Sequence, residues 1–159
     1  MTEPDRGRAA VAAVEEAAFG GTHADEALDR ERLHDLVADV VDGPWWQQCG
    51  PAVTVITPRR STRSSTARSR RGEPVEIRLA EGQLTTATVA HELAHALAGV
   101  AAGHGELFRA AHIDVCALLC GVETAAALAD AYPAFGLVVA DRAWPAPWRA
   151  DGDTFRIVV

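Results

Sequence analysis

The chain contains no lysine, no long apolar run and no CxxC motif. All 15 basic residues other than histidine are arginine, which with the abundant alanine indicates a GC-rich coding sequence. No stretch approaches the roughly 20 apolar residues needed to span a bilayer, and the N-terminus lacks an apolar signal-peptide core. Three cysteines without a CxxC motif argue against a disulfide framework and a zinc ribbon. These absences predict a cytoplasmic protein without a membrane segment.

Length and composition fit one globular domain spanning residues 1–159. Apolar residues form 48% and charged residues 23% of the chain, which is the balance of an ordinary folded domain. The net charge of −7 argues against general affinity for nucleic acid. However, six arginines and no acid lie between Arg59 and Arg71. We interpret this segment as a solvated loop; the alternative is a surface for an acidic partner or nucleic acid.

Periodicity and turn signals place helices and strands along the chain. Residues 5–19 form a predicted helix, and a second begins at Thr22 or Asp25 and ends at Gly43-Pro44. Strands are predicted at 52–57 and 74–79, with an edge strand near 66–71 as one option for the segment between them. Further helices are expected at 85–100, 105–120 and 123–131, before Pro133. A Trp/Pro tail covers 141–159, and its last five residues could pair as a strand.

Residues 91–95 read His-Glu-Leu-Ala-His, an HExxH motif. A helix advances about 100° per residue, so His91 and His95 lie about 40° apart on one face. Apolar residues gather on the opposite face, among them Val89 and Leu93. Glu92 lies on the flank, where it can reach a water molecule without binding the metal. Two imidazoles on one face with a flanking carboxylate are typical of hydrolytic zinc sites, in which Glu92 acts as general base.

A catalytic zinc site needs a third protein ligand. His104 is the favoured candidate, because it follows a helix break and two adjacent glycines permit a close approach. Glu106, Asp114 and Glu123 are the alternatives. Imidazole ligands favour Zn²⁺ over manganese or cobalt under cellular supply.

Other polar residues have a functional and a structural interpretation. His112 could face the site and steady an oxyanion, but a partly exposed helix position is favoured. Asp114 could hold a ligand histidine, although a surface position is favoured. Tyr132 is expected to pack in the core, and Cys116 and Cys120 are expected to be small buried side chains. Trp45 and Trp46 are expected to anchor the loop after the second helix.

The stretch VEIRLAEGQLTTATVAHELAHAL, followed by HGELF, resembles the SprT-like zinc metalloprotease domain. The layout of the chain is also similar to a small family of metallohydrolases from high-GC Gram-positive bacteria. The resemblance is specific over residues 74–124 and implies His91, His95 and His104 as zinc ligands with Glu92 as general base. Glu106 stands where the family usually has a proline. The Cys-rich ribbon that often docks nucleic acid is missing, so DNA-directed proteolysis is not implied.

We therefore predict an α+β, zincin-like domain with N-terminal helices, a small and mostly antiparallel sheet, the HExxH helix and a supporting helix. The predicted function is zinc-dependent hydrolysis of a peptide or protein substrate, with Glu106, His112 and Asp114 as candidate surrounding residues. The alternative is a non-catalytic zinc-stabilised module that binds an acidic partner or nucleic acid through the arginines between Arg59 and Arg71.

Overall fold

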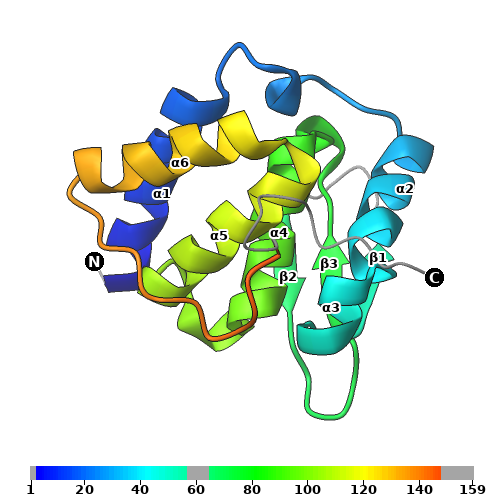
Figure 1. Cartoon of the computed structure of the whole chain (residues 1–159). Coiled ribbons are helices and arrows are strands. Elements are labelled where there is room, and N and C mark those ends of the chain that lie inside the picture. Colours follow the sequence, from blue (N-terminus) through cyan, green and yellow to red (C-terminus); the bar gives the residue numbers. More distant parts are fainter. Residues whose placement is uncertain (1–2, 57–64, 148–159) are drawn as a thin grey trace.

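The computed structural model describes residues 3–56 and 65–147, and this part of the chain forms an α+β fold (Figure 1). A short 3₁₀ turn precedes α2, and two others flank α4. The helices and strands are α1 (Glu3–Phe19), α2 (Arg30–Val41), α3 (Pro44–Cys49), β1 (Val53–Ile56), β2 (Thr66–Arg68), β3 (Val75–Arg78), α4 (Thr86–Ala98), α5 (Glu106–Leu119) and α6 (Val122–Ala134).

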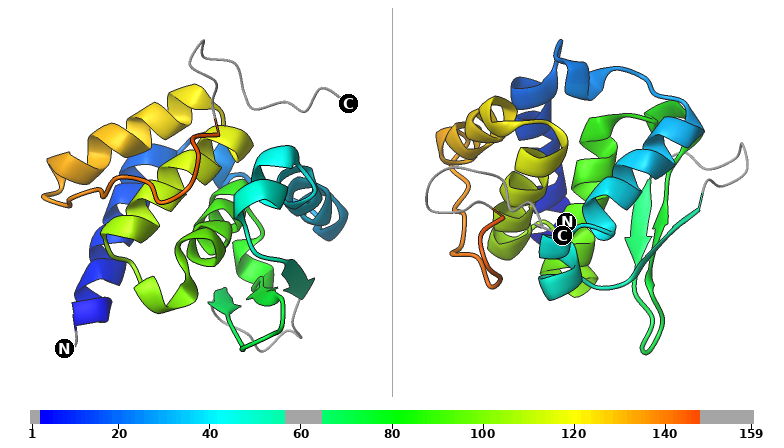
Figure 2. Two further views of the ribbon diagram at one scale, coloured as in Figure 1. Left: turned by 60° about the horizontal axis from the view of Figure 1, so that its bottom comes forward. Right: turned by 45° about the vertical axis from the view of Figure 1, so that its right-hand side comes forward.

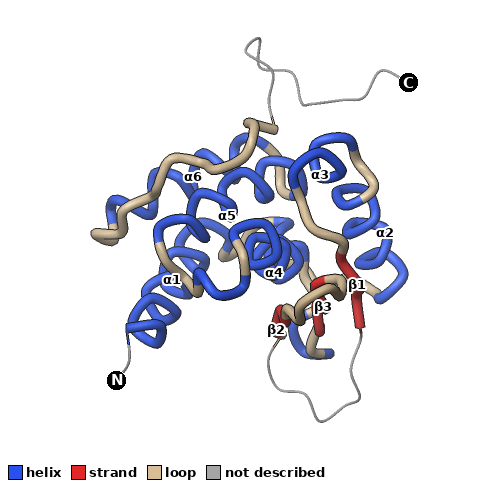
Figure 3. The backbone as a smooth tube through the Cα atoms, turned by 90° about the horizontal axis from the view of Figure 1, so that it is seen from below, coloured by secondary structure: helices blue, strands red, loops and turns tan. Residues whose placement is uncertain are grey.

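Helix α4, which carries the HExxH motif, lies at the centre of the fold. It packs against α5 on one side and against α2, β2 and β3 on the other. Helix α5 lies between α4 and α6, and α6 in turn contacts α1 (Figure 2). In the view along α4, the sheet and α2 lie on one side of this helix, and α1, α5 and α6 lie on the other (Figure 3). Helix α4, which carries His91 and His95, is therefore held in place by elements on both sides.

The three-stranded sheet is mixed, with the order β1-β3-β2. Strand β1 pairs with β3 in parallel, from Val53 opposite Val75 to Ile56 opposite Arg78. Strand β2 pairs with β3 antiparallel, as expected of a hairpin, and confirms the edge strand predicted near 66–71. The prediction of a mostly antiparallel sheet was wrong. The central strand β3 runs parallel to β1 and antiparallel to β2, because β1 and β2 run in opposite directions on its two edges.

The core contains the apolar faces predicted for the helices. Val11, Val14 and Phe19 of α1 are at most 2% exposed, and Leu93 of α4 is fully buried. Cys116 and Cys120 are buried with free thiols, as predicted. Trp45 and Trp46 are also buried, on the short helix α3 that the sequence did not predict. Their indole Nε1 atoms donate to the carbonyl oxygens of Pro145 at 2.6 Å and Pro51 at 2.7 Å, which anchors α3.

Two predicted helix boundaries differ from the structure. Helix α2 begins at Arg30 instead of Thr22 or Asp25, because Leu28 N–H donates to Leu84 O at 2.7 Å and holds the preceding residues in an extended bridge. Asp29 then caps the helix by accepting from Arg32 N–H at 2.8 Å. Helix α6 continues through Pro133 instead of ending before it.

Several predictions fall on parts of the chain outside the described residues. These are the first arginines of the segment from Arg59 to Arg71, and most of the Trp/Pro tail with its terminal strand. Of the arginines in that segment, Arg68, Arg70 and Arg71 lie in the described part and are exposed. Within residues 3–56 and 65–147, no helix combines the length and apolar character that crossing a membrane requires.

Candidate metal centre

The two histidines of the HExxH motif lie side by side on α4. Thr85 caps this helix, since its Oγ1 accepts from Thr88 N–H at 3.1 Å. Leu93 is fully buried on the opposite face, and this packing sets the rotation of the helix. The ring centroids of His91 and His95 are consequently 5.0 Å apart, on the side that faces away from the sheet.

His104 reaches the same place from the turn between α4 and α5. Two glycines shape this turn, with φ of +93° at Gly99 and +56° at Gly103, a region of backbone space that favours glycine. His104 Nε2 lies 3.1 Å from His91 Nε2 and 3.2 Å from His95 Nε2. The structure therefore brings together the three histidines that the sequence pointed to as a ligand set.

The spacing of these three nitrogens fits a metal ion better than a hydrogen-bond network. One imidazole nitrogen either carries a proton or offers a lone pair, so His104 Nε2 can make at most one of the two possible hydrogen bonds. Zn²⁺ binds imidazole nitrogens at about 2.0–2.1 Å, which places the corners of a tetrahedral site roughly 3.3 Å apart. The observed separations of 3.1 and 3.2 Å are close to that edge length.

The protonation states expected of His95 and His104 also suit metal binding, which requires a free lone pair. Burial, followed by the charge of His91, lowers the pKa of His95 to about 3 and that of His104 to about 4. Both imidazoles are therefore neutral at pH 7. Burial also opposes the charged form of His91, but its hydrogen bond to Glu15 and the charge of Glu15 outweigh burial and raise the pKa of His91.

Glu15 on α1 is a site residue that the sequence reasoning missed. Its Oε1 lies 2.6 Å from His91 Nδ1, so the carboxylate accepts the proton of this nitrogen and leaves Nε2 directed at the other histidines. Burial raises the pKa of Glu15, but the hydrogen bond to His91 and the charges of the neighbouring histidines together outweigh burial and lower the pKa. A signal was present in the sequence, because Glu15 lies between Val11 and Phe19 on the apolar face of α1.

Glu92 lies beside the three histidines and is only 4% exposed. Its Oε2 has no hydrogen-bond partner among the described residues. Burial raises the pKa of Glu92 to about 7, against the opposing charge of His91. A buried carboxyl group with a free oxygen and a pKa near neutrality has the properties of a general base.

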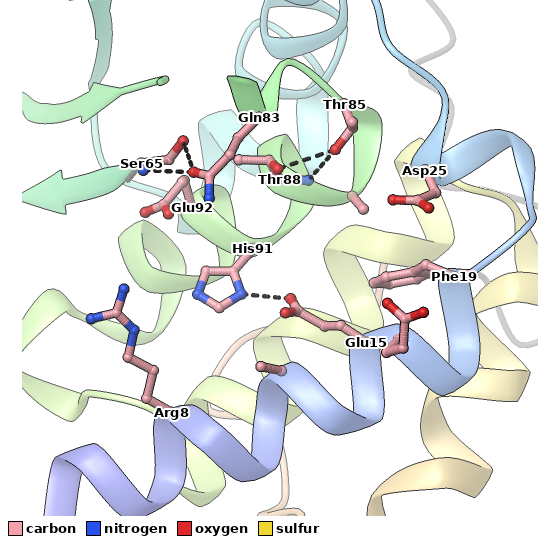
Figure 4. A pocket seen from close by; sticks show the side chains of 14 residues that line it. Arg8, Glu15, Phe19, Asp25, Ser65, Gln83, Thr85, Thr88, His91 and Glu92 are labelled. Carbon is pink, nitrogen blue, oxygen red and sulfur yellow. Dashed lines mark hydrogen bonds and ion pairs between the residues drawn. The ribbon is translucent and has the colours of Figure 1, made fainter. Parts of the chain in front are cut away.

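A cleft of about 310 Å³ opens onto Glu92 and His91. Its walls come from α1 on one side and from the start of α4 with the preceding segment on the other, and most of the lining residues are polar (Figure 4). Arg8 and Glu15 project from α1 toward His91, while Asp25 lies farther along the lining. The cleft therefore makes His91 and Glu92 accessible from one side of the molecule.

Four other candidate residues lie outside the three-histidine cluster. Glu106, the first residue of α5, is exposed, as is Glu123 on α6, and neither belongs to a group that could hold a metal in the described part. The preference for an exposed His112 was wrong, since this side chain is fully buried behind His91 and does not line the cleft.

The preference for Asp114 on the surface was also wrong, because it is 3% exposed. Asp114 accepts two hydrogen bonds from Arg142 and one from Trp144 Nε1, each at 2.8 Å. It thus fastens the segment after α6 to α5, and its hydrogen bonds in the described structure involve no histidine of the cluster.

Comparisons of the chain with protein-family models, with curated proteins and with solved structures find no match.

Proposed function

We propose that this protein is a zinc-dependent hydrolase that cleaves a peptide or related amide bond, with His91, His95 and His104 as metal ligands and Glu92 as general base. The observation that carries the proposal is the convergence of three imidazole Nε2 atoms beside a buried carboxyl oxygen without a partner in the described part of the chain. The resemblance of residues 74–124 to SprT-like metalloproteases supports the same chemistry.

Zinc, when bound, supplies a Lewis acid that activates water and polarises a substrate carbonyl. Glu92 accepts a proton from the attacking water and later gives it to the leaving amine. A pKa of about 7 suits both steps, because the carboxyl group can hold and release a proton near neutral pH. Burial of Glu92 also keeps its carboxylate from being solvated by bulk water, which strengthens its action on a nearby proton.

Arg8 brings a positive charge to the same end of the cleft. The side chain is exposed and projects from α1 toward His91 (Figure 4). A guanidinium placed there stabilises the negative charge that develops on a carbonyl oxygen under attack, or binds a carboxylate of the substrate. The opening of the cleft at Glu92 favours catalysis over a purely structural metal, because a structural site is closed to substrate.

The proposal is tested first by measuring zinc per chain in the purified protein by elemental analysis. The native chain is expected to hold about one zinc, and His104→Ala to lose most of it, because two imidazoles bind the ion far more weakly than three. His34→Ala is the matched control, since His34 is an exposed histidine on α2. A native chain that holds no zinc after reconstitution would contradict the proposed site.

Hydrolysis is tested on a library of quenched fluorescent peptides with the native protein and Glu92→Gln. The variant removes the base and keeps the shape of the side chain, so we expect full zinc content with activity reduced by about 10²–10⁴-fold. Zinc binding without hydrolysis of any peptide in the library would favour the alternative, a non-catalytic zinc-stabilised module. Equal activity of Glu92→Gln and native protein would exclude Glu92 as the base.

A further inference from the structure

Three polar side chains from three different helices, two of them fully buried, form a row of contacts that ends on His91. Tyr132 of α6 lies with its hydroxyl 2.6 Å from His112 Nδ1 on α5. His112 Nε2 lies 3.5 Å from Glu15 Oε1 on α1, and the same oxygen is 2.6 Å from His91 Nδ1. We infer that Tyr132, His112 and Glu15 are positioning residues that orient His91 for metal binding.

The direction of each contact follows from the donors and acceptors present. His91 directs Nε2 at the other two ligand histidines, so its Nδ1 carries the proton and donates to Glu15. His112 Nε2 faces the Glu15 carboxylate, which can only accept, so Nε2 carries the proton of the neutral ring and Nδ1 offers a lone pair. The Tyr132 hydroxyl, whose pKa is raised by burial, keeps its proton and donates it to His112 Nδ1. The protons donated by Tyr132, His112 and His91 in these contacts therefore all point in the direction of Glu15.

The surrounding residues hold the side chains of this row of contacts in place. His112 and Tyr132 are fully buried, and the rings of Phe19 and Phe108 contact His112 with centroids 5.9 and 5.3 Å away. Apolar walls make an unpaired polar group costly, so the side chains gain by keeping their contacts with one another. His112 Nε2 has no full hydrogen bond in the described structure, and the Glu15 charge at 3.5 Å provides its stabilising contact.

The consequence for the metal is a fixed tautomer and a fixed ring plane at His91. A carboxylate that accepts the second N–H of a metal-binding histidine also makes its other nitrogen a stronger donor, and loss of such a partner typically weakens metal binding about 10–100-fold. The inference rests on the metal-binding part of the proposed function. It adds that α1, α5 and α6, and not only the segment from α4 to His104, determine the affinity.

Glu15, His91 and His112 could alternatively hold a second metal ion, since one ligand atom from each lies within 4.8 Å of the others. The 2.6 Å separation of Glu15 Oε1 and His91 Nδ1 favours a hydrogen bond instead. Two tetrahedral ligands at about 2.0–2.1 Å from one ion would lie roughly 3.3 Å apart. The two arrangements predict different numbers of bound ions per chain.

The test measures the zinc dissociation constant by chelator competition for native protein, Glu15→Gln, Tyr132→Phe and the double variant. Glu16→Gln is the matched control, because Glu16 is the exposed neighbour on α1 and loses the same charge. We expect about 10–100-fold weaker binding for Glu15→Gln, a smaller loss for Tyr132→Phe and no effect of Glu16→Gln. Because Tyr132 acts through Glu15, the double variant should bind zinc as Glu15→Gln does.

Cobalt(II) substitution and thermal unfolding separate positioning from a merely structural role. A positioning role predicts that the visible cobalt spectrum changes in Glu15→Gln and in Tyr132→Phe. A structural role predicts lower unfolding temperatures of the metal-free variants, with unchanged spectra and zinc dissociation constants, and this result would overturn the inference. Two zinc ions per native chain would also overturn it.

The outcomes for the two proposals remain distinct. Equal zinc affinity of Glu15→Gln and Glu16→Gln, with one zinc in the native chain, would remove the positioning role and leave the proposed hydrolase intact. Weakened zinc binding in Glu15→Gln, with no hydrolysis by the native protein, would support positioning and contradict the hydrolase. A native chain without affinity for zinc would contradict both.

Discussion

The buried His112 predicts that the metal-free protein loses stability when it is acidified from pH 7 to pH 4. Burial lowers the pKa of His112 to about 4 in the folded chain, against 6.5 for an ordinary histidine. The unfolded chain therefore takes up a proton between these two pH values, and the folded chain does not. The stabilising contribution is complete above pH 6.5 and declines as the pH falls toward 4.

The size of this effect follows from the difference between the two pKa values of His112. Each tenfold difference in proton affinity corresponds to about 1.4 kcal/mol, so His112 alone accounts for about 3 kcal/mol of lost stability. Burial also lowers the pKa values of His95 and His104, which act in the same direction. The raised pKa values of His91 and Glu92 act in the opposite direction. A variant of His112 is therefore needed to isolate its share.

The assay is urea unfolding of the metal-free protein at half-unit steps of pH between 7 and 4. The variant H112F/Y132F removes both partners of the buried contact, so no phenol is left without its acceptor. We expect its free energy of unfolding to fall by about 3 kcal/mol less than that of the native protein over this range. Parallel pH curves for the two proteins would refute the reasoning, because they would show that His112 is protonated equally in both states.

Three further predictions concern stability. Gly50→Ala is expected to lower the free energy of unfolding by about 1–3 kcal/mol, because a Cβ there would overlap the buried ring of Trp46. Gly82→Ala, whose Cβ would meet nothing within 4 Å in the described structure, is the control, and urea unfolding compares the two. Asp114→Asn should lower the unfolding temperature, because it weakens the paired hydrogen bonds from Arg142, and an unchanged temperature would contradict their contribution. Free zinc at 100 times its dissociation constant should raise the free energy of unfolding by about 2.7 kcal/mol, and a chelator should reverse the gain.

Much of the fold could be predicted because local signals and tertiary packing agree in those places. The apolar stripe opposite His91 and His95 predicted helix α4, and Leu93 is fully buried on that side. The alternating strands at 52–57 and 74–79 were found for the same reason. The start of α2 was misplaced because Thr22 caps only a 3₁₀ turn. A backbone hydrogen bond from Leu28 to Leu84, 56 positions away, then holds the chain extended before α2 begins.

The sequence by itself determined the spacing of His91, Glu92 and His95 on one helix, because helical periodicity depends only on positions along the chain. It also drew attention to His104, through the glycines that permit the turn. Only the tertiary structure decided that Glu15, His112 and Tyr132 lie behind His91, and that Asp114 is buried with Arg142. These hydrogen bonds join residues 20 to 76 positions apart. No local pattern encodes the distance between two helices that meet only after the chain has folded.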